Sequence, residues 1–165
     1  MTAGVPGASN QSVKSRAAGV GFPRGMRLLR HADFERVYKL GRRHFSASMT
    51  VFYVARVDGQ TPGTRRVGAV ATCGLRVGFT VGRALGGAVD RNRMKRRLRE
   101  AVRLAPAPAE VGADVVINPK RSLLANDFEA VLNEVRRAFV VIEQKLATRG
   151  KILNHEGHEV SRRKS

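Results

Sequence analysis

The sequence predicts a single α+β domain, an α-β sandwich whose elements follow the order helix, strands, helix, strand, helix. Three observations lead to this prediction. Apolar residues recur at helical spacing in three segments, they alternate along others as in strands, and they make up 42% of a 165-residue chain, enough for one modest core. We expect the folded domain over residues 25–147, with a flexible tail over residues 1–24 and a basic flexible tail over residues 148–165.

The first half of the domain is expected to hold one helix and at least two strands. Phe34, Val37 and Tyr38 have the spacing of one helical face, and Gly41 is suited to end that helix. Next, we expect a strand at residues 45–57 and a loop at residues 58–64. A candidate strand follows at residues 67–72 and a second clear strand at residues 76–81. In the first strand Phe52 lies on the side opposite the main alternation, so both faces are expected to be partly buried.

The second half is expected to hold two helices and a short strand. The first of these helices has an apolar stripe made of Met94, Leu98, Ala101, Val102 and Ala105. Residues 113–117 predict the strand. Asn126, with Glu129 three residues later, resembles a capping box for the last helix. That helix has a stripe made of Phe128, Val131, Leu132, Val135, Phe139, Ile142 and Leu146.

The charge of the chain limits the kinds of partner it can have. A formal net charge of +18 at pH 7 calls for a polyanion, and nucleic acid is the commonest partner of so basic a domain. The sequence has neither an apolar run long enough for a transmembrane helix nor the pattern of a secretory signal. With a single cysteine as well, we expect a cytoplasmic protein without a membrane partner.

A dense basic run opens the second helix. Cations near a helix N-terminus oppose the helix dipole, and Asp90 is the acidic residue that offsets them. Arginine side chains and free backbone N–H groups at such a position suit phosphate oxygens, so a bound polyanion explains the arrangement. The alternative is a solvated basic face without a specific partner. The run consists of Arg91, Arg93, Lys95, Arg96, Arg97 and Arg99.

This region resembles a known family. Arg91-Asn92-Arg93, followed by Met94-Lys95-Arg96, is similar to the RNR signature of the bacterial ribonuclease P protein component. The resemblance covers roughly residues 26–146. Its other parts are Leu28-Leu29-Arg30, Phe34 and Tyr38 with Gly41, the strand Val77-Gly78-Phe79-Thr80-Val81 with Arg83, and Gly112-Ala113-Asp114-Val115-Val116.

The resemblance implies both a fold and a function. The family fold is a sandwich with a left-handed βαβ crossover, which is uncommon among proteins. The family binds the catalytic RNA of ribonuclease P, and together they remove the 5′ leader of precursor tRNA by Mg²⁺-dependent hydrolysis. Because the RNA holds the metal ions and supplies most of the catalysis, we expect no catalytic residue and no protein-bound cofactor. The expected partners are the catalytic RNA and the leader, without a further protein.

The resemblance also implies roles for individual residues. Contact with the catalytic RNA is expected for Arg91, Asn92, Arg93, Lys95, Arg96 and Arg99. Contact with the single-stranded leader is expected for Phe34, Tyr38, Tyr53 and Arg83, since aromatic stacking and a basic groove hold single strands. From spacing alone, core packing of the three aromatic residues and a helix-capping role for Asn92 stay open.

The chain departs from the family pattern at three positions. Gly82 stands where the family often has Ser, and Ala84 where it often has a second basic residue after Arg83. Arg97 stands where the family is often apolar. The departures concern the turn before the basic helix and one side of that helix.

Two other functions compete with this hypothesis. The first is a ribosomal or ribosome-assembly protein, which would not need aromatic residues exposed to a single strand. The second is a nucleoid DNA-binding protein, for which the sequence offers no recognition helix. A protein-only nuclease would need clustered carboxylates, whereas Asp58, Asp90 and Asp114 are spread along the chain.

Overall fold

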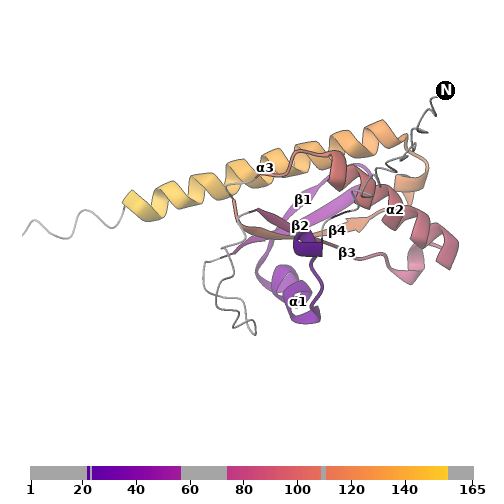
Figure 1. Ribbon diagram of the computed structural model, residues 1–165, viewed down its shortest axis with the longest axis horizontal. Helices are drawn as coiled ribbons and strands as arrows, with labels where there is room; N and C mark the ends of the chain where they lie inside the picture. Colours follow the sequence, from indigo (N-terminus) through magenta and orange to yellow (C-terminus); the bar gives the residue numbers. More distant parts are fainter. Residues whose placement is uncertain (1–21, 23, 57–73, 109–110, 156–165) are drawn as a thin grey trace, which may run out of the picture.

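The structure is a computed structural model that describes residues 22, 24–56, 74–108 and 111–155 (Figure 1). Within these residues three α-helices and four strands form one α+β unit. The helices are α1 (His31–Leu40), α2 (Ala88–Leu104) and α3 (Phe128–His155). The strands are β1 (Arg42–Phe45), β2 (Met49–Ala55), β3 (Leu75–Phe79) and β4 (Ala113–Pro119), and short 3-10 helices are η1 (Arg24–Met26), η2 (Arg83–Leu85) and η3 (Arg121–Leu124).

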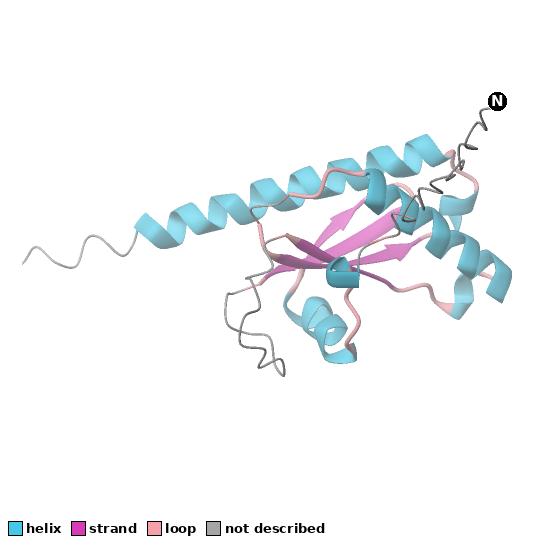
Figure 2. Ribbon diagram, in the orientation of Figure 1, coloured by secondary structure: helices cyan, strands magenta, loops and turns pink. Residues whose placement is uncertain are grey.

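The strands form one mixed sheet in the order β1-β2-β4-β3 (Figure 2). β2 pairs antiparallel with β1 and with β4, whereas β3 and β4 run parallel and are connected through α2. The left-handed βαβ crossover that the family resemblance implies would be this β3-α2-β4 unit. The segment before α1 runs along the outer edge of β3, where the Leu28 N–H donates to the Val77 carbonyl at 3.0 Å.

The sheet lies between two helical layers, α1 on one face and α2 with α3 on the other (Figure 1). Alternation along β2 decides which side chain belongs to which layer. Met49, Val51 and Tyr53 enter the larger core under α2 and α3, while Phe52 and Val54 face α1. The larger core buries apolar side chains of every element that it joins, each worth about 1.5–3 kcal/mol when fully buried.

The turn between β1 and β2 is fastened to α3 by one carboxylate. Glu134 Oε2 accepts hydrogen bonds from the Ser48 backbone N–H at 3.0 Å, from the Ser48 hydroxyl at 2.8 Å and from the Ser46 hydroxyl. Burial raises the pKa of the Glu134 carboxyl, but these hydrogen bonds and the charge of Lys120 outweigh it, so the pKa lies below its ordinary value.

The structure confirms the predicted order of elements and corrects some of their bounds. The single strand predicted at residues 45–57 is a hairpin, β1 and β2 with a turn between them. The last helix continues to His155, so the C-terminal tail does not begin at residue 148. That helix begins at Phe128 after Asp127, one residue later than a cap at Asn126 requires. The loop and candidate strand at residues 58–72 lie outside the described residues.

Candidate RNA-binding surfaces

α2 begins with an uncapped N-terminus and an almost unopposed set of cations. Gly86, at φ +141°, and Gly87 turn the chain from η2 into the helix, and no side chain caps the first turn. An added Cβ at Gly86 would lie 2.9 Å from an Asp90 carboxylate oxygen, so the glycine lets that acid fold back over the turn. Asp90 is the acidic residue of the first turn, as the sequence indicated.

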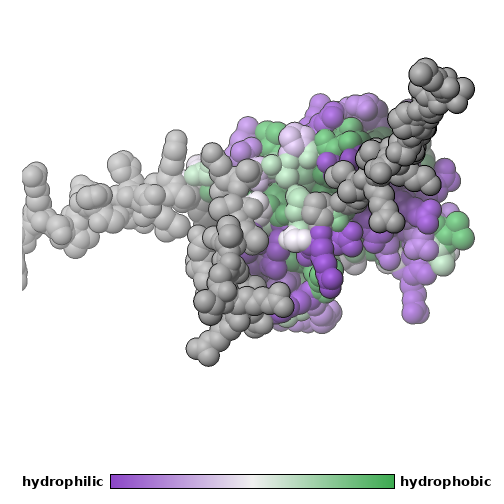
Figure 3. All heavy atoms as spheres, viewed as in Figure 1, coloured by the Kyte–Doolittle hydropathy of each residue, from purple (hydrophilic) through white to green (hydrophobic). Residues whose placement is uncertain are grey.

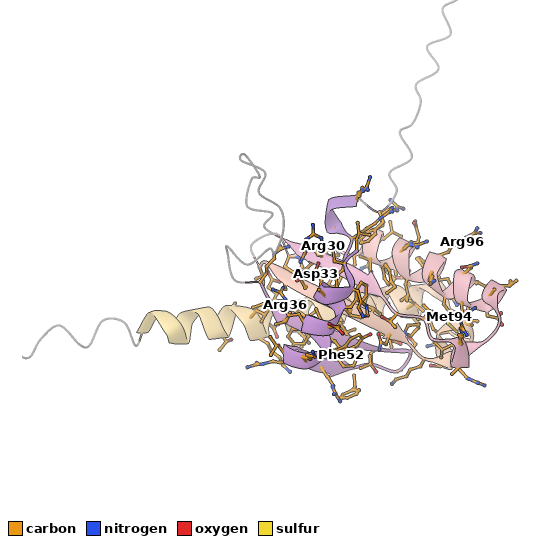
Figure 4. All side chains as sticks on the ribbon, turned by 90° about the horizontal axis from the view of Figure 1, so that it is seen from below. Arg30, Asp33, Arg36, Phe52, Met94 and Arg96 are labelled. Carbon is orange, nitrogen blue, oxygen red and sulfur yellow. The ribbon has the colours of Figure 1, made fainter. Side chains whose placement is uncertain are left out.

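The side of α2 that faces away from the sheet forms the first surface. Its members, which we call the outer face, are Asn92, Arg93 and Arg96. All three are exposed, and no acidic side chain of the described residues pairs with either arginine. In Figure 4 Arg96 lies on α2, well apart from the labelled Asp33 and Arg36 of α1. Hydrophilic side chains predominate at this end of the molecule, with a smaller hydrophobic group at its tip (Figure 3).

The α1 side of the sheet carries the second surface, a group of three half-buried rings that we call the aromatic face: Phe34, Tyr38 and Phe52. The Tyr38 ring meets the Phe52 ring edge-on, with centroids 4.9 Å apart. The Tyr38 hydroxyl lies 2.9 Å from both Asn118 Oδ1 and Thr80 Oγ1, so it donates to the amide oxygen and accepts from the threonine. These hydrogen bonds fix the ring over the C-terminal ends of β3 and β4.

A cation stands beside these rings. Arg43, on the edge strand β1, is the direct partner of Phe52 in the sheet register, and its guanidinium carbon lies 5.3 Å from the ring centroid. Arg43 is exposed. An exposed guanidinium against a ring places positive charge where the phosphates of a stacked strand would pass. In Figure 4 Phe52 lies beneath α1, with Arg30, Asp33 and Arg36 along the helix.

Tyr53 does not belong to the aromatic face. Its side chain is 1% exposed in the core under α2 and α3, and its hydroxyl has no hydrogen-bond partner among the described residues. Burial raises the pKa of this hydroxyl. A ring in that position is not available to stack on a base, so the structure favours core packing for Tyr53, and Phe52, its neighbour on the opposite face of β2, is the ring of this strand that lies in the aromatic face.

Arg83 lies in η2, exposed, between the end of β3 and the start of α2. Among the described residues, no group of three or more His, Cys, Asp or Glu side chains converges to hold a metal ion. None of the described helices combines the length and apolar character needed to cross a membrane.

Comparison with known proteins decides the family. A family model described as Ribonuclease P matches residues 22–143, which is most of the chain. The chain belongs to the ribonuclease P protein family. It is thus a protein component of the ribonuclease P endoribonuclease, an RNA-binding protein of tRNA processing.

Individual relatives agree with this assignment. The ribonuclease P protein component of Paramagnetospirillum magneticum is 36% identical over 113 residues, covering 68% of this chain and 78% of that protein. The one of Maridesulfovibrio salexigens is 36% identical over 97 residues, covering 59% and 68%. Two solved structures share the fold. The RNase P protein of Thermotoga maritima has TM-score 0.52 at 23% identity over 68% of this chain and 94% of that one. The RNase P protein of Staphylococcus aureus has TM-score 0.51 at 21% identity over 71% and 94%.

In this ribonuclease P protein a glycine positions the first ring of the aromatic face. Gly78 of β3 lies under Phe34, and a Cβ added there would come within 2.5 Å of Phe34 Cζ and 3.1 Å of Leu28 Cβ. Any larger residue would lift the ring from the sheet. The sequence contained both residues, but the contact between them depends on how α1 is laid over β3.

A buried acid that the sequence analysis did not select as a site residue holds α1 against the sheet. Asp114 of β4 is fully buried, and it accepts two hydrogen bonds from Arg76 of β3, at 2.7 and 2.8 Å, and one from Arg36 of α1. Arg76 also lies 3.5 Å from Asp33 of α1. The hydrogen bonds with Asp114 raise the pKa of Arg76 further above its ordinary value. The cluster fixes the angle at which α1 presents Phe34 and Tyr38.

Arg97, the departure from the family pattern on α2, has a structural role. Its guanidinium donates to the carbonyls of Leu123 at 2.7 Å, Leu124 at 3.2 Å and Asn126 at 2.5 Å. These carbonyls belong to η3 and to the segment that leads into α3. Arg97 therefore joins α2 to the start of α3. Because its guanidinium is engaged there, Arg97 is not one of the cations of α2 that are available to RNA.

Proposed function

We propose that this ribonuclease P protein binds the catalytic RNA of the enzyme through the outer face of α2 and the precursor-tRNA leader through the aromatic face. The observation that carries the proposal is the pairing of two surfaces with different chemistry. One consists of exposed cations without acidic partners, the other of half-buried rings beside a cation. The first suits phosphates of a folded RNA and the second suits stacked bases of a single strand.

Contact with the catalytic RNA is assigned to the RNR helix. Arg93 and Arg96 are exposed on the side of α2 opposite its buried stripe, and Asn92, which directly precedes Arg93, is exposed there too. Arginine binds phosphate through two parallel N–H groups, so two such side chains one turn apart suit adjacent phosphates of a structured RNA. Arg91 is half-buried, with its Nε atom lacking a partner among the described residues, and we place it at the inner border of this contact.

Contact with the leader is assigned to Phe34, Tyr38 and Phe52, with Arg43 and Arg83 at the rim. Each base stacked on an aromatic side chain contributes about 1–3 kcal/mol. Stacking tolerates any base, so this surface suits leaders of differing sequence. The Tyr38 hydroxyl, held by Asn118 and Thr80, keeps its ring from turning.

Mg²⁺ is assigned to the RNA of the holoenzyme. The buried carboxylate of Asp114 is paired with Arg36 and Arg76. Among the described residues, no cluster of His, Cys, Asp or Glu side chains could hold a metal ion. In the proposed holoenzyme the RNA would hold the Mg²⁺ ions on which hydrolysis of precursor tRNA depends. The protein then contributes binding and orientation, and no catalytic residue is assigned to it.

Leader contact is tested by removing one ring. We expect Phe52→Ala to weaken binding of a leader-bearing precursor tRNA to the holoenzyme by roughly tenfold, within the range of one lost stacking contact. Binding of the same tRNA without its leader should be unchanged. The measurement is the pair of dissociation constants for the two tRNAs.

The matched control is Tyr53→Phe, the neighbouring residue in the core. This variant keeps the buried ring and removes a hydroxyl that has no partner among the described residues, so leader binding should stay at the wild-type value. Equal weakening for tRNA with and without the leader in Phe52→Ala would overturn the leader assignment.

A further inference from the structure

The edge strand β1 and the helix α3 border a groove of about 700 Å³ (Figure 1). Its lining comes from the end of β1 with the turn that follows, and from one side of α3. Two of its apolar side chains are open to solvent, since Phe45 is 67% exposed and Val140 is 49% exposed. Ala47, Ala130 and Val141 complete the apolar part of the lining. The groove thus presents apolar surface that the rest of the described chain leaves uncovered.

The outer edge of β1 carries backbone groups without partners among the described residues. The Ser46 N–H donates to the Met49 carbonyl at 3.0 Å, so these two residues form a hydrogen-bonded pair of the hairpin. In an antiparallel ladder such pairs alternate with pairs that exchange no hydrogen bond, and the register places Phe45 and Arg43 in pairs of the second kind. The backbone N–H and C=O groups of Phe45 and Arg43 therefore point outward, away from β2.

Two cations beside the groove are available to an anionic partner. Arg137 of α3 lines the groove and is exposed. Lys145, one residue beyond two further helical turns, lies near His44 of β1, and its charge adds to burial in lowering the pKa of that imidazole. Neither Arg137 nor Lys145 pairs with an acid among the described residues.

The acid and the other arginine of the lining are already engaged. The Glu134 carboxylate accepts hydrogen bonds from the turn between β1 and β2, and Arg136 lies 3.7 Å from Glu129. The next acid along the helix, Glu143, does not line the groove. The charge left over at the groove is therefore positive.

We infer that this groove is a docking site for an extended acidic segment of a partner protein, which adds a strand to the outer edge of β1. The outward N–H and C=O groups of Arg43 and Phe45 would pair with the backbone of the added strand. Because side chains alternate along a strand, every second one would lie over the groove, where apolar side chains would cover Val140. Acidic side chains of the same segment would reach Arg137 and Lys145. The inference does not rest on the proposed function.

The edge and its charge favour this partner over RNA and over a second copy of the chain. A strand edge offers donors and acceptors in turn, which a peptide backbone matches completely, whereas phosphates only accept hydrogen bonds. A second copy would bring Arg42 and Arg43 of both chains together at one edge, and each chain carries a net charge of +18. The two arginines thus oppose self-pairing and select an acidic strand.

The probe for this site is a short fluorescein-labelled peptide of alternating glutamate and valine. A lysine–valine peptide of the same length is the control for charge. We measure fluorescence anisotropy with the full chain, both free and bound to a bacterial ribonuclease P RNA, since peptide that sits on the RNA-binding surfaces should be displaced by the RNA. The glutamate–valine peptide should bind in both states and the lysine–valine peptide in neither.

Three single variants localise the binding. Val140→Lys puts a charge into the apolar part of the groove and should weaken peptide binding by roughly tenfold, or about 1.4 kcal/mol. Arg137→Glu should weaken it by about threefold, the size of an exposed ion pair. Arg24→Glu makes the same charge reversal in η1, next to β3 at the opposite edge of the sheet, and should leave binding unchanged. All three positions are exposed, and the thermal unfolding midpoint of each variant checks the fold.

Amide hydrogen exchange tests the added strand itself. The bound peptide should slow exchange at Arg43 and Phe45, whose N–H groups point outward. Exchange at Arg42 and His44 should change little, because their N–H groups face β2. Protection of neither outward amide would overturn strand addition.

Three further results would overturn the inference. The first is no binding of the glutamate–valine peptide, or binding that the catalytic RNA or the lysine–valine peptide abolishes. The second is a uridine oligonucleotide that binds in place of the peptide and is weakened by Val140→Lys and Arg137→Glu, which would make the groove an RNA site. The third is a dimer of the free chain that Val140→Lys dissociates in analytical ultracentrifugation, which would make the groove a contact between copies.

Discussion

Neighbouring cations on α2 have different surroundings, and the surroundings give each side chain its role. Arg96 is exposed. Lys95 is half-buried and lines a small hollow that Phe34 also lines. Arg97 donates to three backbone carbonyls of the segment that leads into α3. From residue type alone, all three would be interpreted as cations that contact RNA. Their directions follow from the 100° step of the helix once its buried stripe is known.

Arg97 should contribute to stability and not to RNA binding. Arg97→Met removes hydrogen bonds from a charged donor to three carbonyls, and we expect the free energy of unfolding to fall by about 2 kcal/mol. Urea unfolding measures the loss, and Arg96→Met, at an exposed position, should stay within about 0.5 kcal/mol of wild type. A normal unfolding free energy for Arg97→Met, combined with weaker binding to the catalytic RNA, would contradict this role.

The choice between Phe52 and Tyr53 shows where prediction from the sequence ends at this scale. Strict alternation placed the two rings on opposite faces of one strand. Which face lies under α1 depends on how the first helix is laid over the sheet, and a periodic pattern does not contain that information. The sequence therefore placed Tyr53 on a face from which the structure excludes it, in the core under α2 and α3.

At the scale of elements, the regular spacing of apolar residues was enough to predict the helices. The strand β1 lacks such a pattern and was not predicted as a separate strand. The stripes of α2 and α3 predicted both helices because each buries one continuous side. β1 has the sequence Arg42-Arg43-His44-Phe45, without an apolar alternation, because it is an edge strand with little buried surface. Its hairpin with β2 was read as one strand for that reason.

The turn of that hairpin is tied to α3 by Glu134, and this tie should depend on pH. Because the pKa of Glu134 is lowered in the folded state, its contribution to stability is present above the ordinary value of 4.5 and is lost as pH falls through the folded value. Between about pH 6 and about pH 3 the wild type should therefore lose more unfolding free energy than Glu134→Gln. Unfolding curves of both proteins across that range measure the difference, and parallel losses would show that the hydrogen bonds to Ser46 and Ser48 do not stabilise the charged form.

For the whole molecule, the layered arrangement keeps the two proposed RNA-binding surfaces on opposite sides of one sheet. α2 with its outer face covers one side of the sheet, and α1 with the aromatic face covers the other. A hollow at the β3 edge is lined both by Phe34 of α1 and by Lys95 and Arg99 of α2. The parallel pairing of β3 with β4 requires a crossover, and α2 is that crossover, so the fold itself places the basic helix next to the strand that supports Phe34.

The net charge of +18 belongs to this scale as well. It predicted a polyanionic partner from composition alone, and membership of the ribonuclease P family agrees with that prediction. Composition could not indicate two separate surfaces, since that division arises from the sheet that keeps them apart. The buried cluster around Asp114 was equally hidden, because its members come from α1, β3 and β4.

The most direct measurement is cleavage of a precursor tRNA by a bacterial ribonuclease P RNA at low Mg²⁺, with and without this protein. The account predicts that the protein restores cleavage at the 5′ end of the mature tRNA, and that the gain shrinks when the leader is shortened to a single nucleotide. Tight binding to the catalytic RNA without any gain in cleavage would contradict it, and the structural RNA-binding function typical of ribosomal proteins would then describe the chain better.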